Sequence, residues 1–395
     1  MARNKTVGTD CFGESALLAW AKIPECAHVD FSLTDEQVLL RESVGKYIQD
    51  AGGVERHRKL AVTEIGFDPA AWATFAELGW LALPFSEEQG GLGGSVTDLM
   101  VLSEALGRGL VREPYLHTAV TCGGLLAAFA SEEQKQLYLP PLINGEAQWA
   151  FAFAEQSGGY AWDKITTSAG GELASLFLNG AKITALNAQI ADHFLVTAMV
   201  DHELALLLVD GDSPGITRTC FTAVDGSKGA HLEFDAVAAT LVCKLTVNEL
   251  ESALAPALIA IGGESLGAMQ VLLEATVEYC KTREQFGQPI GKFQALQHRM
   301  ADMYLKIEET RSLLYYAAIL TDEGDDQAAA ARAGMKVKLA EAGRFISHEA
   351  VQLHGGIGMT DELIVGHLFK RLLLLSKLFG DGDYHMERYL AQRAA

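Results

Sequence analysis

The sequence predicts an α+β protein that is mostly helical, with an N-terminal helical domain, a central antiparallel β-barrel or sandwich, and a C-terminal four-helix bundle. Three observations predict this class. Apolar residues recur at helical spacing up to about residue 149, short runs rich in β-branched residues follow, and long amphipathic segments fill the chain after about residue 253. Spacings near 3.6 and 2 residues distinguish helices from strands. We expect an N-terminal extension and three domains, with the boundaries 1–29, 30–149, 150–253 and 254–395.

The first helical region begins at Thr34, which is suited to cap a helix and is followed by the acidic residues Asp35 and Glu36. The residues after them place an apolar stripe on one face of a helix: Val38, Leu39, Val44 and Ile48. Four glycines in "SEEQGGLGG", at 86–94, interrupt the helical pattern, because glycine destabilises a helix interior by about 1 kcal/mol. Further helices are expected at about 68–79, 95–108, 115–130 and 132–139.

Seven short apolar runs lie between about residues 150 and 253, and Gly, Asp, Asn or Pro separates one run from the next. Runs of this kind are typical of strands. No helical segment lies between them, so we expect an antiparallel sandwich or barrel and not a parallel Rossmann sheet. The "GGIG" at 355–358 lacks the preceding strand that a dinucleotide fingerprint needs.

The last part of the chain returns to the helical period. Residues 266–280 and 293–307 each carry an apolar stripe, and a glycine-proline break at 287–291 separates the two segments. Two more helices are expected at about 326–354 and 361–377. Four long helices in succession predict a bundle.

Composition and charge exclude several classes of function. A chain of 395 residues with 49% apolar content can bury a large core, and its net charge of -20 would repel nucleic acid phosphates and anionic lipid. No CxxC pair or ligand-like spacing occurs among the cysteines, so neither a zinc site nor a disulfide framework is expected. The six cysteines are Cys11, Cys26, Cys122, Cys220, Cys243 and Cys280. A reducing cytoplasm fits this pattern.

The longest apolar stretches are too short to cross a bilayer. The runs at 257–261 and 372–375 fall far short of the roughly 20 residues that a spanning helix needs. The "ALLAWA" at 16–21 is too short for a secretion signal and follows the acidic Glu14. We therefore expect no membrane span, and we assign no role to the extension at 1–29.

Two motifs near the C-terminus form a specific combination: "YCKTREQFGQPIGKFQALQHRMADMY" at 279–304 and "EAVQLHGGIGMTDE" at 349–362. In these motifs the sequence resembles the acyl-CoA dehydrogenase family of flavoproteins, most strongly from about residue 259 to 371. The resemblance is looser from 31 to 258, where it covers mainly domain order and segment length. It implies FAD as the cofactor, an acyl-CoA thioester as the substrate, and an electron-transferring flavoprotein as the electron acceptor.

In such enzymes the turn between the first two bundle helices contacts the adenosine-diphosphate half of FAD in a neighbouring subunit. The resemblance assigns this contact to Arg283, Phe286, Ile290 and Gln294, and a second contact to Gln352, Gly355 and Gly356. The residue types suit the task, because an arginine fork matches a pyrophosphate and glycines allow close backbone approach. The alternative is that Arg283 is an ordinary surface charge and Phe286 a core ring.

The segments that would hold the flavin ring depart from the family pattern. A "TEPGAGSD"-like loop is replaced by "AEQSGGYAWD" at 154–163, and a "K-x-W-I-T-N-G"-like strand by "KITALNA" at 182–188. Ala154 and Leu186 stand where hydroxyl groups are usual, and Thr184 stands where an indole would shield the flavin. Each lost hydrogen bond weakens binding by about 0.5–1.5 kcal/mol.

The position of the catalytic base also departs from the pattern. The family's usual glutamate, in "YEGT", corresponds to Phe379 or Gly380 in "LFGDGDYHMER" at 378–388, and one inserted residue would bring in Asp381. The alternative position on the first bundle helix holds Pro256 beside Ala257. Asp381 is therefore the candidate catalytic base, ahead of Glu264 and Asp383. The alternative is that Asp381 only opens a turn. No metal site is expected.

Together these features predict FAD-dependent α,β-dehydrogenation of an acyl-CoA by one subunit of a hetero-oligomer, with a homologous partner subunit. The "GDGDYH" at 380–385 and the segment 224–235 resemble the small subunits of bacterial two-subunit, heterotetrameric acyl-CoA dehydrogenases such as pimeloyl-CoA dehydrogenase. Three alternatives stay open: a catalytically silent partner that clamps the adenosine end of another subunit's FAD, a homo-oligomer with a complete site, and another flavin chemistry on the same fold.

Overall fold

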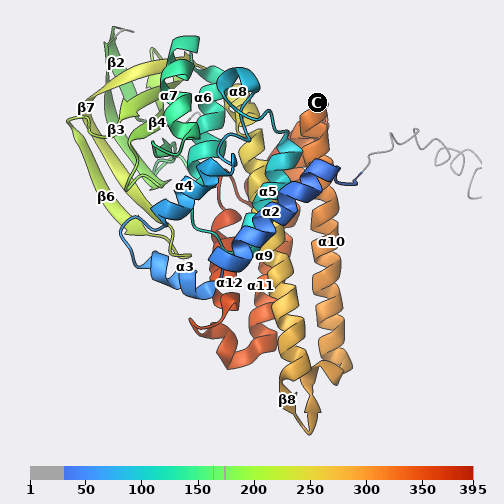
Figure 1. Ribbon diagram of the computed structural model, residues 1–395. Coiled ribbons are helices and arrows are strands. Elements are labelled where there is room, and N and C mark those ends of the chain that lie inside the picture. Colours follow the sequence, from blue (N-terminus) through green and yellow to red (C-terminus); the bar gives the residue numbers. More distant parts are fainter. Residues whose placement is uncertain (1–30, 163, 173–174, 395) are drawn as a thin grey trace, which may run out of the picture. The chain divides into compact units, whose positions relative to one another are not determined.

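The computed structural model describes residues 31–162, 164–172 and 175–394, and the chain from Leu33 onward forms one compact unit. The predicted extension at 1–29 lies outside the described residues. In the described part, helices come first, strands follow, and helices return (Figure 1). This order confirms the predicted fold class. The predicted division of the chain at residues 30, 150 and 254 stays a prediction.

The N-terminal helices begin where the sequence provides caps. The Thr34 side chain accepts a hydrogen bond from the Gln37 amide, and the Gln37 side chain accepts one from the Thr34 amide, which completes a capping box. Ser131 and Gln134 form a second capping box, and the helix that they start runs on to Ile143, beyond the predicted end at 139. The helices are α2 (Asp35–Ala51), α3 (Val54–Ala61), α4 (Pro69–Glu77), α5 (Val96–Arg108), η3 (Leu116–Gly123), α6 (Gly124–Phe129) and α7 (Glu132–Ile143).

The η3 segment is a π-helix and continues directly into α6. In this segment the Thr121 hydroxyl donates to the Leu116 carbonyl, five residues back, at 2.7 Å. π-helical segments are rare and occur frequently at functional sites. The predicted helix at 115–130 is therefore present, with a wider winding in its first half.

The strands form one seven-stranded sheet. They are β1 (Trp149–Ala152), β2 (Ser168–Glu172), β3 (Ser175–Leu186), β4 (His193–Val200), β5 (Glu203–Asp210), β6 (Ile216–Thr222) and β7 (Lys228–Lys244). Along the sheet the order is β1-β4-β2-β3-β7-β5, with β6 paired to β7. Most pairs are antiparallel, as predicted, but β1 runs parallel to β4. The strands β2 and β4 meet only through Ser168 and Met199, so the sheet is sandwich-like and not a closed barrel.

Alternation along the strands divides the core. Leu195, Leu206 and Leu208 pack with the N-terminal helices, whereas Phe194 and Leu207 point to the opposite side and form the interior of the sandwich. Burial of each such side chain stabilises the fold by about 1.5–3 kcal/mol. The sheet is thereby fixed against the helical region on one face.

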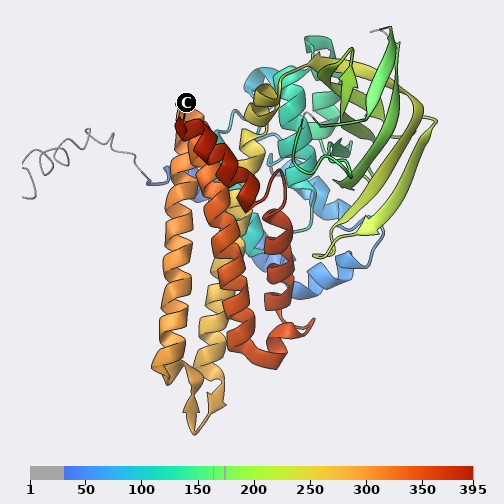
Figure 2. The same ribbon diagram turned by 180° about the vertical axis from the view of Figure 1, so that it is seen from behind.

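The C-terminal helices form the predicted bundle (Figures 1 and 2). They are α8 (Val247–Ala253), α9 (Ala255–Thr282), α10 (Gln294–Glu323), α11 (Ala328–His354), α12 (Ile364–Leu375) and α13 (Gly382–Ala394). Met269, Leu314 and Met335 are fully buried in its core. Among the described residues, α9 alone is long and apolar enough to cross a membrane, but 67% of its most apolar window is buried, as expected of a core helix.

A small hairpin joins α9 to α10. Its strands are β8 (Glu284–Gln285) and β9 (Gln288–Pro289), and the short helix η4 (Ile290–Lys292) follows. In both views the hairpin lies at the end of the bundle away from the sheet. The predicted glycine-proline break is therefore a projecting tip.

Candidate functional site

The turn of the bundle-tip hairpin is strained. Phe286 and Gly287 connect β8 to β9 and both have positive φ, +54° and +78°. Glycine adopts this conformation freely, whereas phenylalanine does so at a cost of about 1–3 kcal/mol. The Phe286 ring is 90% exposed and packs edge-on against Phe293, with 6.1 Å between ring centroids. A strained, exposed aromatic ring of this kind is accessible to a ligand.

Arg283 lies at the base of the hairpin and is exposed to solvent. The Arg283 carbonyl accepts a hydrogen bond from the Ile290 amide at 2.8 Å, which fixes its backbone. Its guanidinium is exposed and has no ion-pair or hydrogen-bond partner among the described residues. Gln294 is exposed at the first position of α10. Gly291 lies against α9, where an added Cβ would come within 2.9 Å of the Cys280 carbonyl oxygen.

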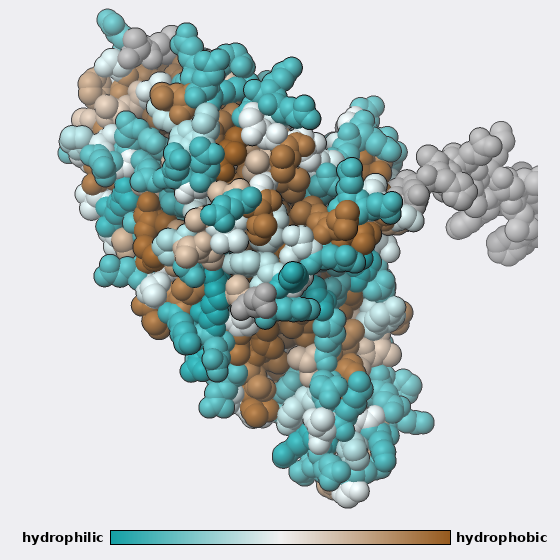
Figure 3. All heavy atoms as spheres, in the orientation of Figure 1, coloured by the Kyte–Doolittle hydropathy of each residue, from teal (hydrophilic) through white to brown (hydrophobic). Residues whose placement is uncertain are grey.

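The second predicted contact lies at the same end of the bundle. Gln352 is exposed near the end of α11, and Gly355 and Gly356 are exposed in the short helix η5 (Gly355–Met359) that follows. The His354 ring stacks on Tyr279 of α9 at 4.5 Å, which ties the end of α11 to the end of α9. The structure therefore gathers the predicted cofactor-binding residues at one end of the bundle. That end is largely hydrophilic on the face drawn in Figure 3.

This set of groups fits the nucleotide half of FAD. A free guanidinium suits a pyrophosphate, an exposed aromatic face suits a purine ring, and exposed amides offer both donors and acceptors. The glycines leave backbone open to a ligand.

A cavity of about 380 Å³ lies between the sheet and the bundle, and we call it the central cavity. Its wall is formed by His117, Thr121, Phe151, Phe153, Ala154, Gly159, Tyr160, Thr184, Leu186, Phe221, Ala223, Leu374, Lys377, Leu378 and Phe379. It includes Ala154, Thr184 and Leu186, the positions where the sequence departs from the flavin-ring motifs. No aspartate or glutamate among the described residues belongs to this wall.

Aromatic rings dominate one side of the central cavity. Phe153 stacks on Phe151 at 5.1 Å and lies 4.9 Å from Trp162 and 5.5 Å from Phe379. Phe379 has φ +55°, and its carbonyl oxygen accepts a hydrogen bond from the His385 Nε2 at 3.1 Å. Phe379 therefore presents a ring at the place where the resemblance would put a carboxylate.

Asp381 is placed elsewhere. Its Oδ2 accepts a hydrogen bond from the Lys377 Nζ at 2.9 Å and its Oδ1 accepts one from the Tyr384 amide at 3.1 Å, in the first turn of α13. Burial acts to raise the Asp381 pKa, but these hydrogen bonds prevail and hold the pKa below its ordinary value, which makes Asp381 a weaker base. Asp381 lines a separate surface groove together with Asp383. The structure does not bring either carboxylate into the central cavity.

Sequence reasoning missed a buried ion pair that positions the wall of this cavity. The Lys182 Nζ lies 2.7 Å from the Glu155 Oε1, and both side chains are buried. Thr166 and Thr167 also donate to the Glu155 carboxylate. Burial lowers the Lys182 pKa to about 8; burial also acts to raise the Glu155 pKa, but its hydrogen bonds hold it at about 2. Glu155 lies in the segment 154–163 and Lys182 in the segment 182–188, the two segments that depart from the flavin-ring motifs. An acidic residue in one segment and a basic residue in the other was the only sequence signal for this pair.

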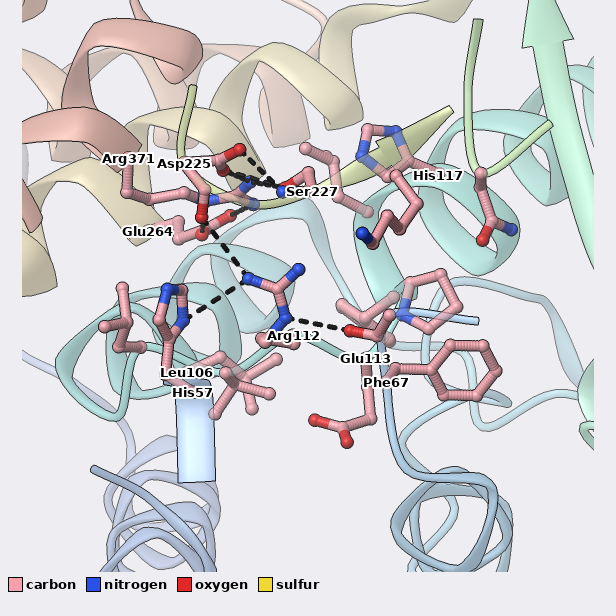
Figure 4. A pocket seen from close by; sticks show the side chains of 18 of the residues that line it. His57, Phe67, Leu106, Arg112, Glu113, His117, Asp225, Ser227, Glu264 and Arg371 are labelled. Atoms are coloured by element: carbon pink, nitrogen blue, oxygen red, sulfur yellow. Dashed lines mark hydrogen bonds and ion pairs between the residues drawn. The ribbon is translucent and has the colours of Figure 1, made fainter. Parts of the chain in front are cut away.

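A second network joins the three parts of the chain (Figure 4). The Arg371 guanidinium on α12 donates to both carboxylate oxygens of Glu264 on α9, and its third nitrogen donates to Asp225 in the β6–β7 loop at 2.8 Å. Arg112 donates to the carbonyl oxygens of Gly66 and Gly226. These groups surround a smaller cavity of about 60 Å³, which we call the junction cavity. Glu264 is thus engaged in an ion pair and is not a free base.

Three family models match successive parts of the chain: the acyl-CoA dehydrogenase N-terminal domain over residues 34–146, the middle domain over 150–237 and the C-terminal domain over 248–394. A probable acyl-CoA dehydrogenase of Bacillus subtilis, YngJ, is 30% identical over 381 residues, which cover 92% of this chain and 99% of the relative. The chain belongs to the acyl-CoA dehydrogenase family.

Other relatives place the chain in the same family. The mitochondrial short-chain specific acyl-CoA dehydrogenase of Homo sapiens is 31% identical over 306 residues, which cover 72% of this chain and 73% of the human protein. The ChsE4-ChsE5 complex from Mycobacterium tuberculosis superposes with a TM-score of 0.85 at 28% identity, and the match covers 93% of this chain and 99% of the matched chain. Butyryl-CoA dehydrogenase from Megasphaera elsdenii superposes with a TM-score of 0.84 at 26% identity, and the match covers 93% of this chain and 100% of the matched chain.

Membership fixes the general chemistry. The chain is an oxidoreductase that acts on acyl-CoA, and FAD is its cofactor. When bound, FAD accepts the two electrons that leave the acyl group. Of the two halves of the FAD site, the nucleotide half fits the residues present, whereas the central cavity lacks the expected hydroxyl groups and, among the described residues, a carboxylate.

Proposed function

We propose that this chain is one subunit of a hetero-oligomeric acyl-CoA dehydrogenase. Its bundle tip holds the adenosine-diphosphate half of an FAD whose ring is held by a homologous partner subunit, and the partner supplies the carboxylate base. The observation that carries this proposal is a contrast between two places. Arg283 at the tip is exposed and has no partner among the described residues, whereas the described wall of the central cavity has Phe379 in place of a base.

The contrast matters because the reaction needs a base within hydrogen-bond reach of the α-carbon proton. Phe379 cannot accept a proton. Asp381 faces Lys377 and the first turn of α13, so its use as a base would require the 376–381 loop to rearrange. Asp381 as this chain's own base remains the alternative within the proposal.

Two solved neighbours support a partner of the same family. Both are named as pairs of proteins. One is the ChsE4-ChsE5 complex. The other is a Tcur3481-Tcur3483 steroid ACAD variant, which superposes with a TM-score of 0.84 at 29% identity over 91% of this chain. We propose a heterotetramer in the cytoplasm, with an electron-transferring flavoprotein as acceptor. The small-subunit resemblance of residues 224–235 and 380–385 supports dicarboxylic or steroid side-chain thioesters as substrates.

The experiment uses the complex of this chain with its partner. Arg283→Ala removes a charged donor to the pyrophosphate, and because hydrogen bonds to charged groups contribute about 1.5–3 kcal/mol, we expect FAD to be released about tenfold to a hundredfold more readily. Lys281→Ala is the matched control, since Lys281 is an exposed cation two residues away with its own partner, Glu278, at 3.6 Å. FAD retained per complex after dialysis is the readout. Equal retention in both variants would refute the trans contact.

A further inference from the structure

The central cavity retains features of a ligand site even though its described wall lacks a base. Two of its wall residues, Thr184 and Phe379, have positive φ, +52° and +55°. For a β-branched residue such as Thr184 this conformation is a genuine outlier. Each position costs about 1–3 kcal/mol, and strain of this kind collects at ligand sites, where the surrounding structure maintains it.

The strain at Thr184 is built into the sheet. The pairing of β3 with β7 shifts register between Lys182 and Ala185, and the Thr184 amide donates to the His231 Nδ1 at 3.2 Å. A bulge at this place turns the Thr184 side chain toward the cavity. The conformation is thus held from outside the cavity, which leaves the Thr184 side chain available to a ligand.

The polar group that stands out in this wall is His117. It lies on the π-helix η3, and its imidazole has no hydrogen-bond partner among the described residues. It borders both the central cavity and the junction cavity, so it lies where the two cavities meet. Burial, with the positive charge of Arg371, lowers the His117 pKa to about 3. The ring is therefore neutral at physiological pH and offers one donor and one acceptor.

The open side of the cavity is marked by Lys377, whose side chain is 55% exposed. Between Lys377 and His117 the wall is mostly aromatic and aliphatic. The Lys377 charge is already paired with Asp381 at 2.9 Å, so the ligand is defined by the remaining wall. A molecule that matches this wall has an apolar body and a polar oxygen at its far end. An acyl chain with an oxygen at its distal end has these two parts.

We propose that the central cavity binds an acyl chain that carries a hydroxyl or carbonyl oxygen near its far end, that His117 makes a hydrogen bond to this oxygen, and that the chain holds the ligand without oxidising it. Only the statement that the ligand is not oxidised rests on the proposed function. His117 is thereby a specificity-determining residue, because it distinguishes an oxygenated tail from a plain one.

The test uses the full-length chain alone, with cis-parinaric acid as a fluorescent probe and with decanoate and 10-hydroxydecanoate as competitors. We expect saturable binding of the probe. Ala223→Trp should weaken this binding at least tenfold, because Ala223 lines the cavity and an indole there would occupy it. Val224→Trp is the matched control, since Val224 is the next residue, is 52% exposed and is not part of the cavity wall.

The second arm tests His117. In the wild-type chain 10-hydroxydecanoate should displace the probe at a concentration about threefold to tenfold lower than decanoate, which corresponds to one added hydrogen bond. In His117→Leu the two competitors should be equal. The inference is overturned if Ala223→Trp binds the probe as tightly as Val224→Trp, or if the preference persists in His117→Leu. Failure here leaves the bundle-tip contact and the proposed function intact. Tight FAD binding by the isolated chain would instead refute the proposed function, and with it the statement that the ligand is held without oxidation.

Discussion

Arg371 and Glu264 form a bidentate ion pair. The Arg371 Nε lies 2.6 Å from the Glu264 Oε1, and the Arg371 Nη2 lies 3.0 Å from the Glu264 Oε2. The pair is mostly buried at the point where the helical region, the sheet and the bundle meet. A buried charge that loses its partner is strongly destabilising, whereas an exposed one is not. This difference gives the first prediction.

Arg371→Met should lower the free energy of unfolding by about 3–5 kcal/mol, because Glu264 and Asp225 would each lose a buried partner. Arg58→Met is the control, since Arg58 forms an exposed ion pair with Asp361. That variant should change the free energy of unfolding by about 0–1 kcal/mol. Denaturant unfolding followed by circular dichroism compares the two, and similar losses in both would show that the Arg371 network does not join the three parts of the chain.

The Glu155 carboxylate should make stability depend on acid pH. Its pKa is about 2 in the folded chain against an ordinary 4.5, so its stabilisation is fully present above pH 4.5 and is lost as the pH falls toward 2. Glu155→Gln should therefore be less stable than the wild type at pH 7, and the difference should shrink below pH 4.5. Urea midpoints between pH 7 and pH 3 measure this. Glu172→Gln, at an exposed position on β2, is the control, and a constant difference between wild type and Glu155→Gln across the range would contradict the prediction.

Phe286→Gly should separate stability from binding. Glycine adopts a φ of +54° without strain, so the variant should be as stable as the wild type or more stable by about 1–2 kcal/mol. In the complex with the partner, the same change should weaken FAD retention because it removes an exposed ring from the tip. Leu137→Gly replaces another exposed large side chain, on α7 away from the tip, and should leave retention unchanged. A Phe286→Gly complex that retains FAD normally would mean that the strained ring has no role in binding.

Asp381→Asn distinguishes the two possible sources of the base. Asparagine caps a helix about as well as aspartate, and the lost ion pair with Lys377 is partly exposed, so stability should fall by less than about 1 kcal/mol. If the partner supplies the base, turnover by the complex should stay within about twofold of the wild type. A fall by a factor of about 10²–10⁴, typical of the loss of a general base, would identify Asp381 as the base.

The sequence predicted those features that depend on neighbouring residues. The capping box of Thr34 with Gln37 spans three residues, and the helical and strand periods are local, so the order of helices and strands was predictable. The parallel pairing of β1 with β4 was not, because alternation does not reveal strand direction. Likewise, the period of η3 gave no sign that this segment is a π-helix.

The sequence indicated that the candidate tip residues lie close together, whereas it gave no sign of how the interior cavities are built. The binding role of the tip residues stays a prediction. Arg283 and Phe286 lie in one short motif, so a resemblance could assign them together. Arg371 contacts residues 107 and 146 positions away, and no local pattern indicates such contacts. His117 lies in an apolar segment with no motif, and its position between two cavities depends on the packing of the sheet against the bundle.

We infer that this chain lacks a complete flavin site of its own. The most direct measurement is the amount of FAD bound per chain after expression of this protein alone, determined by absorbance after release with denaturant. We expect a colourless protein with almost no FAD, and about one FAD for each pair of chains once the homologous partner is present. One tightly bound FAD per chain in a symmetric assembly of this protein alone would contradict it.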